Sequence, residues 1–178
     1  MNLTLASYIT LLRIVLIAPI AYFIYFGGVL NSILALLFFL IASITDYLDG
    51  YIARKTSTET DLGATLDLYA DKLLIIIVLI FINTAIDDTL LIVLSSIIII
   101  REFILIVLRH FKTLRGRLKV RALGKLKTSI QMIAISMLLI APYAGTGFCY
   151  VALSLTAIAA LISTISLIDY LRILVRDD

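Results

Sequence analysis

Six long apolar segments constrain this chain more than any other feature of its sequence. They lie at about 8–26, 30–45, 73–86, 90–100, 130–142 and 148–168. Hydrophobic residues make up 62% of the 178 residues, whereas a soluble domain contains about 45–50% apolar residues. The excess requires lipid as the solvent. We therefore expect an all-α, polytopic membrane protein, a bundle of six transmembrane helices forming one domain over residues 1–178.

Several of the apolar segments are shorter than the ~20 residues that a helix needs to cross a bilayer. The residues that adjoin them carry charge, so we expect the helices to continue through 46–54, 67–72, 101–109 and 125–127. Short connections with turn-forming residues lie at 27–28, 83–88 and 142–147. No internal repeat or low-complexity linker interrupts this pattern.

The basic residues predict the orientation of the bundle. The connections at 27–29, 83–89 and 142–147 contain no Lys or Arg, and every basic residue lies toward the opposite helix ends. By the positive-inside rule, that side is cytoplasmic and both termini face the cytoplasm. Most charged residues would then share one level near the cytoplasmic surface, which predicts a polar cavity that opens to the cytoplasm.

Two aspartate series lie within this polar level. On one helix, Asp46, Asp49, Gly50 and Ala53 follow helical spacing and form one stripe. On the next helix, Gly63, Asp67 and Asp71 repeat every four residues. Carboxylates beside membrane-spanning segments are costly and indicate a functional site. Four of them on two facing stripes would form a divalent-cation site, and their hard oxygen ligands favour Mg²⁺ or Mn²⁺.

A second group of charged residues consists of cations. Arg101 lies deeper in an apolar run than a topology signal requires, and Lys125 and Lys127 directly precede an uninterrupted helix. We interpret these three as phosphate ligands, and the basic residues of 109–121 as surface residues that attract anionic lipid. Metal and phosphate sites at headgroup depth predict phosphoryl transfer on a lipid, in which two cations clamp a diphosphate. Arg54 could neutralise the same phosphates.

The complete pattern resembles the signature of the CDP-alcohol phosphotransferases, a family of integral membrane enzymes with six transmembrane helices. The matching residues are Asp46-x-x-Asp49-Gly50-x-x-Ala53-Arg54, eight residues, and Gly63-x-x-x-Asp67-x-x-x-Asp71. Within the family, the chain is similar to the bacterial members that use glycerol 3-phosphate. Two departures are Leu68, where proline is usual, and the absence of an Asn-Ile-Pro opening before Arg13.

The resemblance implies a role for each matched position. Two Mg²⁺ or Mn²⁺ ions would be bound by the four aspartates, with Asp71 also the catalytic proton acceptor. CDP-diacylglycerol would contact Gly50, Ala53, Arg54 and Thr60. The phosphate of the acceptor would bind Arg101, Lys125, Lys127 and Arg13. The implied reaction is attack by glycerol 3-phosphate on the β-phosphorus, which gives phosphatidylglycerophosphate and CMP in the bacterial inner membrane. A homodimer among membrane lipids is expected, and no nucleic-acid partner.

Two alternatives remain open from the sequence. A sister enzyme would use another acceptor alcohol, such as phosphatidylglycerol, as in cardiolipin synthase, or inositol phosphate. An ion transporter would also place aspartates within the membrane. Against the transporter, the charges are confined to one leaflet, and no repeat with broken helices is visible.

Overall fold

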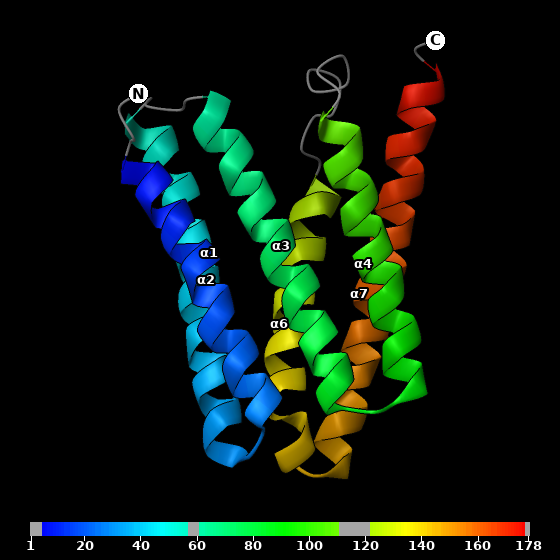
Figure 1. The fold of residues 1–178 in the computed structure, drawn as a ribbon. Helices are drawn as coiled ribbons and strands as arrows, with labels where there is room; N and C mark the ends of the chain where they lie inside the picture. The colour runs from blue at the N-terminus through cyan, green and yellow to red at the C-terminus, as the bar shows by residue number, and fades with distance from the viewer. Residues whose placement is uncertain (1–4, 57–60, 111–121, 177–178) are drawn as a thin grey trace. The chain divides into compact units, whose positions relative to one another are not determined.

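The computed structural model describes residues 5–56, 61–110 and 122–176, with side chains over 10–45, 63, 66–108, 127–169 and 171–172. All regular structure in these ranges is helical (Figure 1). The elements are α1 (Leu5–Phe26), α2 (Val29–Thr56), α3 (Asp61–Ala85), α4 (Thr89–His110), α6 (Ala122–Ile140), the 3₁₀ helix η1 (Ala141–Tyr143) and α7 (Thr146–Arg176). The predicted all-α class is confirmed, and so is the continuation of the helices through their charged ends.

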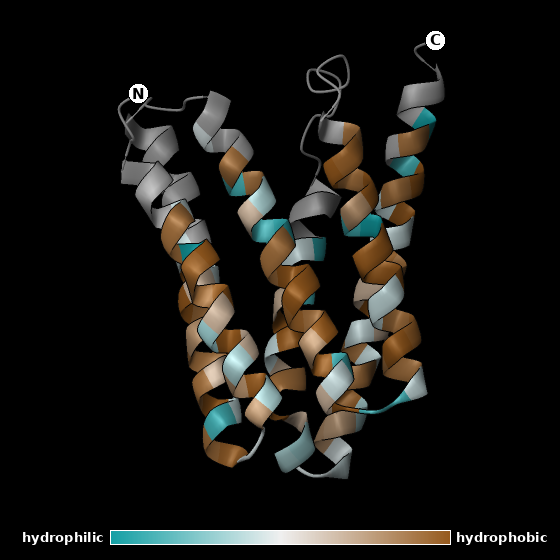
Figure 2. Cartoon of the chain, in the orientation of Figure 1, coloured by the Kyte–Doolittle hydropathy of each residue, from teal (hydrophilic) through white to brown (hydrophobic). Residues whose placement is uncertain are grey.

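The helices differ in how much of a bilayer their apolar parts could cross. Three described segments are long and apolar enough to span a membrane: Leu66–Ala85, Thr89–Leu108 and Thr146–Asp169. The apolar parts of the other helices are shorter, at Thr10–Phe26, Val29–Thr45 and Lys127–Tyr143. Figure 2 shows the strongly hydrophobic character of the described helices. The chain is therefore a helical membrane protein.

The chain divides into two compact units, Met1–Ala85 and Ile86–Asp178. In the first unit, α1 packs against both α2 and α3. The buried residues of this unit follow helical spacing, and on α1 they include Ile17, Ile20 and Ile24. The residues that α2 and α3 contribute to the core of this unit are Ala35, Phe39, Ala42, Ala70, Leu74, Ile75, Val78, Leu79 and Ile82.

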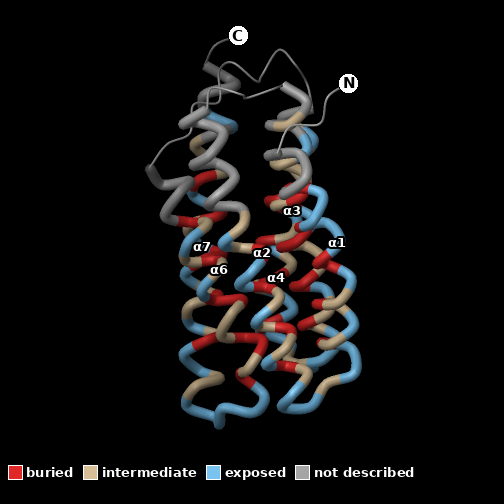
Figure 3. Tube along the Cα trace, turned by 90° about the vertical axis from the view of Figure 1, so that its left-hand side faces the viewer, coloured by how far each residue is buried: buried red, intermediate tan, exposed pale blue. Residues whose placement is uncertain are grey.

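In the second unit, α7 packs against α4 and α6. The buried residues again recur every three or four positions, so each helix turns one stripe inward (Figure 3). On α7 this stripe consists largely of small residues, among them Ala152, Ala159 and Ala160. Small side chains let helix backbones approach closely, which is the usual packing device where lipid removes the hydrophobic drive between helices.

The predicted turns are present where the structure describes them. Gly27 and Gly28 adopt φ values of 62° and 90°, which residues with a Cβ rarely adopt. The Gly27 amide donates to the carbonyl of Phe23 at 3.2 Å and ends α1. Gly145, with φ 90°, precedes α7 in the same way. These turns explain why two helix pairs can reverse direction within a few residues.

Asp88 begins α4 as its N-cap. Its carboxylate Oδ1 accepts a hydrogen bond from the backbone amide of Leu91 at 2.8 Å. The first amides of a helix have no partner within the helix, so this contact satisfies one of them and also places a negative charge at the positive end of the helix dipole.

Replacing Asp88 with Ala should therefore destabilise the protein by about 1 kcal/mol. The measurement is thermal unfolding of the purified protein in detergent. Asp87→Ala is the matched control, because Asp87 is the exposed neighbouring carboxylate and lies just before the cap. Equal melting temperatures for the two variants would contradict the capping role.

Candidate functional site

Two of the predicted aspartates lie on the packed face of α3. Asp67 and Asp71 are one helical turn apart, on the face that also carries Ala70 and Leu74. Asp67 accepts a hydrogen bond at Oδ1 from Arg13 Nη1 of α1 at 2.8 Å. The side chain of Arg13 is fully buried, whereas that of Asp67 is 37% exposed. The ion pair therefore neutralises a buried guanidinium and leaves the carboxylate accessible.

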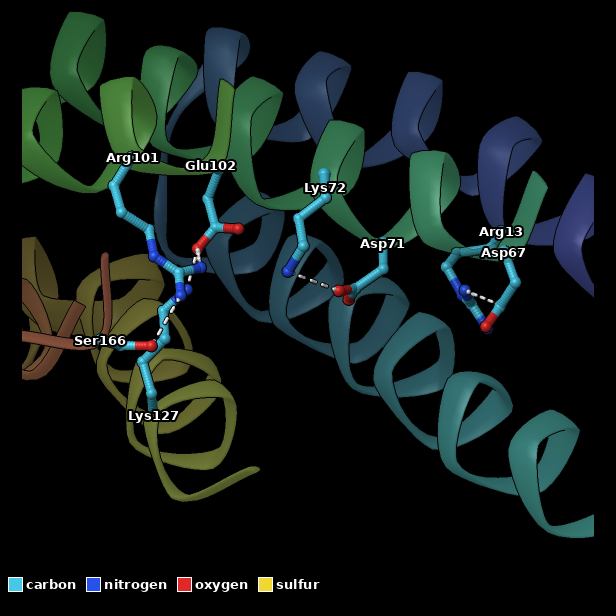
Figure 4. Close-up of polar contacts among 8 residues, drawn as sticks. All are labelled: Arg13, Asp67, Asp71, Lys72, Arg101, Glu102, Lys127 and Ser166. Atoms are coloured by element: carbon cyan, nitrogen blue, oxygen red, sulfur yellow. Dashed lines mark hydrogen bonds and ion pairs between the residues drawn. The ribbon is translucent and has the colours of Figure 1, made fainter. Parts of the chain in front are cut away.

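Asp71 has a different environment. Its Oδ2 lies 3.2 Å from Nζ of Lys72, and both side chains are largely buried (Figure 4). Its other oxygen, Oδ1, is buried and has no hydrogen-bond partner among the described residues. A buried carboxylate oxygen without a donor is costly unless a cation or a proton approaches it. The chemistry of this oxygen fits a hard divalent cation or a proton-accepting role.

The side chains of the other residues predicted to bind CDP-diacylglycerol or the metal ions are not described. Asp46, Asp49, Gly50, Ala53 and Arg54 belong to α2, whose helix is described but whose side chains at these positions lie outside the described residues. Thr60 also lies outside the described residues. Among the side chains that are described, no three acidic, His or Cys residues form one metal-binding group. The four-aspartate site therefore stays a prediction.

The second unit contains a buried charged cluster formed by three helices. Arg101 and Glu102 lie on α4, Lys127 on α6 and Ser166 on α7 (Figure 4). Glu102 Oε1 accepts hydrogen bonds from Arg101 Nη1 at 3.1 Å and from Nζ of Lys127. Arg101 Nη2 donates to Ser166 Oγ at 3.1 Å. Two cations therefore converge on a single carboxylate oxygen.

The electrostatic balance of this cluster favours an added anion. The side chains of Arg101, Glu102 and Lys127 are 5%, 0% and 1% exposed, so solvent screens their charges poorly. Among the described members of this cluster, two cations accompany one carboxylate, a net charge of +1. Burying an ion costs several kcal/mol unless opposite charge and hydrogen bonds compensate. A phosphate, which accepts several charge-assisted hydrogen bonds, would complete that compensation.

The structure brings together some predicted phosphate ligands and not others. Arg101 and Lys127 meet through Glu102. The side chain of Lys125 lies outside the described residues. Arg13 contacts Asp67 in the first unit, so its predicted role at the acceptor phosphate gains no support from a described contact.

Sequence reasoning did not assign Glu102, Ser166 or Lys72 to a site. The sequence could have indicated Glu102, because a charged residue within an apolar helix needs a polar partner and Glu102 directly follows Arg101. No comparable signal marked Ser166, since serines are frequent in membrane helices and usually bond to their own backbone.

Comparison with known proteins shows what this chain resembles over most of its length. The sequence profile of the CDP-alcohol phosphatidyltransferase family matches residues 3–166, which span parts of both units. Two relatives are named CDP-diacylglycerol–glycerol-3-phosphate 3-phosphatidyltransferase. The protein from Rickettsia typhi is 36% identical over 147 residues, covering 82% of this chain and 81% of the relative. The protein from Shigella flexneri is 30% identical over 174 residues, covering 96% and 94%.

A third relative of the same name, from Salmonella choleraesuis, is 31% identical over 164 residues and covers 88% of this chain and 90% of its own length. Since the profile and these relatives each cover most of the chain, the resemblance noted in the aspartate motif extends over nearly the whole sequence. The chain belongs to the CDP-alcohol phosphatidyltransferase family.

Proposed function

We propose that this protein transfers the phosphatidyl group of CDP-diacylglycerol to glycerol 3-phosphate, giving phosphatidylglycerophosphate and CMP. The observation that supports a phosphate-bearing acceptor is the buried pair Arg101 and Lys127, a cationic site in a family whose other substrate is a lipid diphosphate. Relatives whose name specifies glycerol 3-phosphate are 30–36% identical to the chain over the aligned residues.

Binding of the donor substrate, CDP-diacylglycerol, would depend on the aspartates. Asp46, Asp49, Asp67 and Asp71 would hold two divalent cations, Mg²⁺ or Mn²⁺, which neutralise a diphosphate when bound. The accessible carboxylate of Asp67 and the unpartnered oxygen of Asp71 support this role. At helical spacing, the buried series Ala35, Phe39 and Ala42 of α2 continues to Asp46 and Asp49. Gly50, Ala53, Arg54 and Thr60 would contact the CDP group.

The proposed step balances as a substitution at phosphorus. The acceptor's terminal hydroxyl oxygen forms a bond to the β-phosphorus of CDP-diacylglycerol, and the bond from that phosphorus to the bridging oxygen breaks. CMP leaves with the bridging oxygen, and the proton of the hydroxyl passes to Asp71. A buried carboxylate oxygen that lacks a hydrogen-bond donor is a suitable proton acceptor. Arg13 would hold Asp67 in place through their 2.8 Å contact.

The carboxylate of Glu102 would compete with the acceptor phosphate for Arg101 and Lys127. It already neutralises part of the charge on Arg101 and Lys127, so an incoming phosphate must share these cations with a carboxylate. Lys125 would add charge from the same helix as Lys127. The affinity of the cluster for the acceptor phosphate should then be high enough to select a phosphate-bearing alcohol. It should also be low enough for the phosphorylated product to dissociate.

The membrane arrangement forms part of the proposal. All six helices would span the bacterial inner membrane as one domain, with both termini and a shared polar cavity on the cytoplasmic side. The three shorter apolar segments would cross with the help of their charged extensions, whose long basic side chains reach the interface. A homodimer is expected from the family resemblance.

The four aspartates should each be required for metal-dependent activity. Asp67→Asn or Asp71→Asn removes a ligand charge and should lower the rate of CMP release at least ~10²-fold, the scale of electrostatic contributions to catalysis. Asp46→Asn and Asp49→Asn should have similar effects. Asp87→Asn serves as the matched control, because its exposed carboxylate lies outside the motif. Full activity of Asp67→Asn in EDTA would rule out the metal-assisted mechanism.

Neutralising Lys127 should chiefly raise the KM for glycerol 3-phosphate. A charge-assisted contact contributes roughly 1.5–3 kcal/mol, so Lys127→Gln should raise this KM about 10- to 150-fold. The KM for CDP-diacylglycerol should change much less, and Arg54→Gln should show the reverse pattern. Steady-state assays of CMP release with each substrate varied provide the measurement.

Glu102→Gln supplies a control for that experiment. It breaks the same buried ion pair as Lys127→Gln, but it keeps both cations and so should not raise the KM for glycerol 3-phosphate. If both variants raise this KM equally, the effect is structural and the assignment of Lys127 fails. Assays with phosphatidylglycerol and inositol phosphate in place of glycerol 3-phosphate test the sister acceptors directly.

Thiol labelling tests the orientation. In a Cys149→Ala background, cysteines at Asp87 or Ala144 should react with an impermeant reagent from outside the cytoplasmic membrane. Cysteines at Lys55 or Arg117 should react only after the membrane is permeabilised. These outer positions avoid Gly28 and Gly145, whose φ of 90° makes any side chain strained there. The opposite labelling pattern would reverse the proposed topology.

A further inference from the structure

A second buried polar layer lies in the unit that contains the charged cluster. Gln131 of α6 is 1% exposed and Ser163 of α7 is fully buried. The amide atoms Oε1 and Nε2 of Gln131 and the hydroxyl of Ser163 have no hydrogen-bond partner among the described residues. Three such atoms in one layer need an explanation, because each buried polar group without a partner costs about 1–3 kcal/mol.

The layer lies one helical turn from the cations. Gln131 follows Lys127 by four residues, and Ser163 precedes Ser166 by three, so each shares a helix face with a residue of the charged cluster. Both steps lead toward η1, which joins α6 to α7, and these two helices pack against each other. Gln131 lies about 6 Å along α6 from Lys127, and Ser163 lies about 4.5 Å along α7 from Ser166, so the two residues lie at a similar depth on the η1 side of the cluster.

A buried serine or threonine in these helices can bond to a backbone carbonyl of its own helix. Thr156, also on α7 and buried, donates its hydroxyl to the carbonyl of Ala152 at 2.8 Å. Ser95 of α4 bonds in the same way to Leu91 at 2.7 Å. Ser163 has the equivalent option one turn earlier but does not use it among the described residues. Its hydroxyl and the Gln131 amide remain available to a ligand.

We propose that Gln131 and Ser163 form a subsite for a neutral hydroxyl group of the phosphate-bearing acceptor. This inference rests on the proposed function, which places the acceptor phosphate at Arg101 and Lys127. An amide and a hydroxyl can each donate and accept, which matches an alcohol group. In glycerol 3-phosphate the terminal hydroxyl reacts, so the middle hydroxyl is the one that remains for this subsite. A three-carbon chain is suited to the one-turn separation from the cations.

The test compares two acceptors that differ only in that hydroxyl: glycerol 3-phosphate and 3-hydroxypropyl phosphate, which lacks it. The wild-type protein should prefer glycerol 3-phosphate in kcat/KM by about 10-fold, the scale of one buried hydrogen bond with the penalty for leaving its partner unpaired. Gln131→Met, which keeps the volume but removes the amide, should reduce that preference to nearly 1. Its melting temperature should be unchanged or higher, because the variant removes two buried polar atoms that lack a hydrogen-bond partner among the described residues.

Two further variants complete the experiment. Ser163→Ala should reduce the same preference and is a smaller change, so it tests the subsite even if Gln131→Met folds poorly. Ser154→Ala is the matched control, since Ser154 is an exposed serine of α7 that bonds to the carbonyl of Tyr150; its preference should equal that of the wild type.

The possible failures are distinguishable. If the wild type prefers glycerol 3-phosphate and both Gln131→Met and Ser163→Ala keep that preference, the subsite is overturned while the proposed function stands. If the wild type uses neither acceptor but uses phosphatidylglycerol or another alcohol, the proposed function fails and the subsite fails with it.

Discussion

The pairing of charge inside an apolar helix bundle is the constraint on which the rest of this structure depends. Among the described residues, five charged side chains are buried: Arg13, Lys72, Arg101, Glu102 and Lys127. Each contacts a group of opposite charge. The penalty for removing an ion from water is several kcal/mol, and a partner within hydrogen-bond distance offsets it. Two of these pairs, Arg13 with Asp67 and Lys127 with Glu102, join different helices and so constrain which helix faces can pack together.

The two units balance their charges differently. In the first unit, Arg13 contacts Asp67 and Lys72 contacts Asp71, and one oxygen of Asp71 has no hydrogen-bond partner among the described residues. In the second unit, two cations share one glutamate. The first arrangement leaves carboxylate oxygen for cations, and the second leaves positive charge for anions. The metal-assisted transfer to a phosphate-bearing alcohol that we propose would use both kinds of group.

Much of this arrangement could be predicted from local sequence. Several apolar segments are shorter than a bilayer-spanning helix, which predicted that the helices extend through charged residues, as α2 and α4 do. Four-residue spacing placed Asp67 and Asp71 on one face. The pairing of Arg13 with Asp67 could not be predicted, because the two residues are 54 positions apart and periodicity does not specify which helices are neighbours. Ser166 was missed for the same reason, since only packing brings it to Arg101.

The net charge of the second cluster also limits which acceptors the proposed enzyme could select. A cationic alcohol would meet an excess of positive charge in a buried site where screening is weak, and like charges there repel strongly. Phosphate-bearing acceptors all gain from Arg101 and Lys127, so these cations cannot by themselves distinguish glycerol 3-phosphate from inositol phosphate. Neutral polar groups can discriminate between anions, because an acceptor that lacks the matching hydroxyl leaves those buried groups unpaired. Gln131 and Ser163, buried polar residues one turn from the cluster, would under our proposal select acceptors that carry such a hydroxyl.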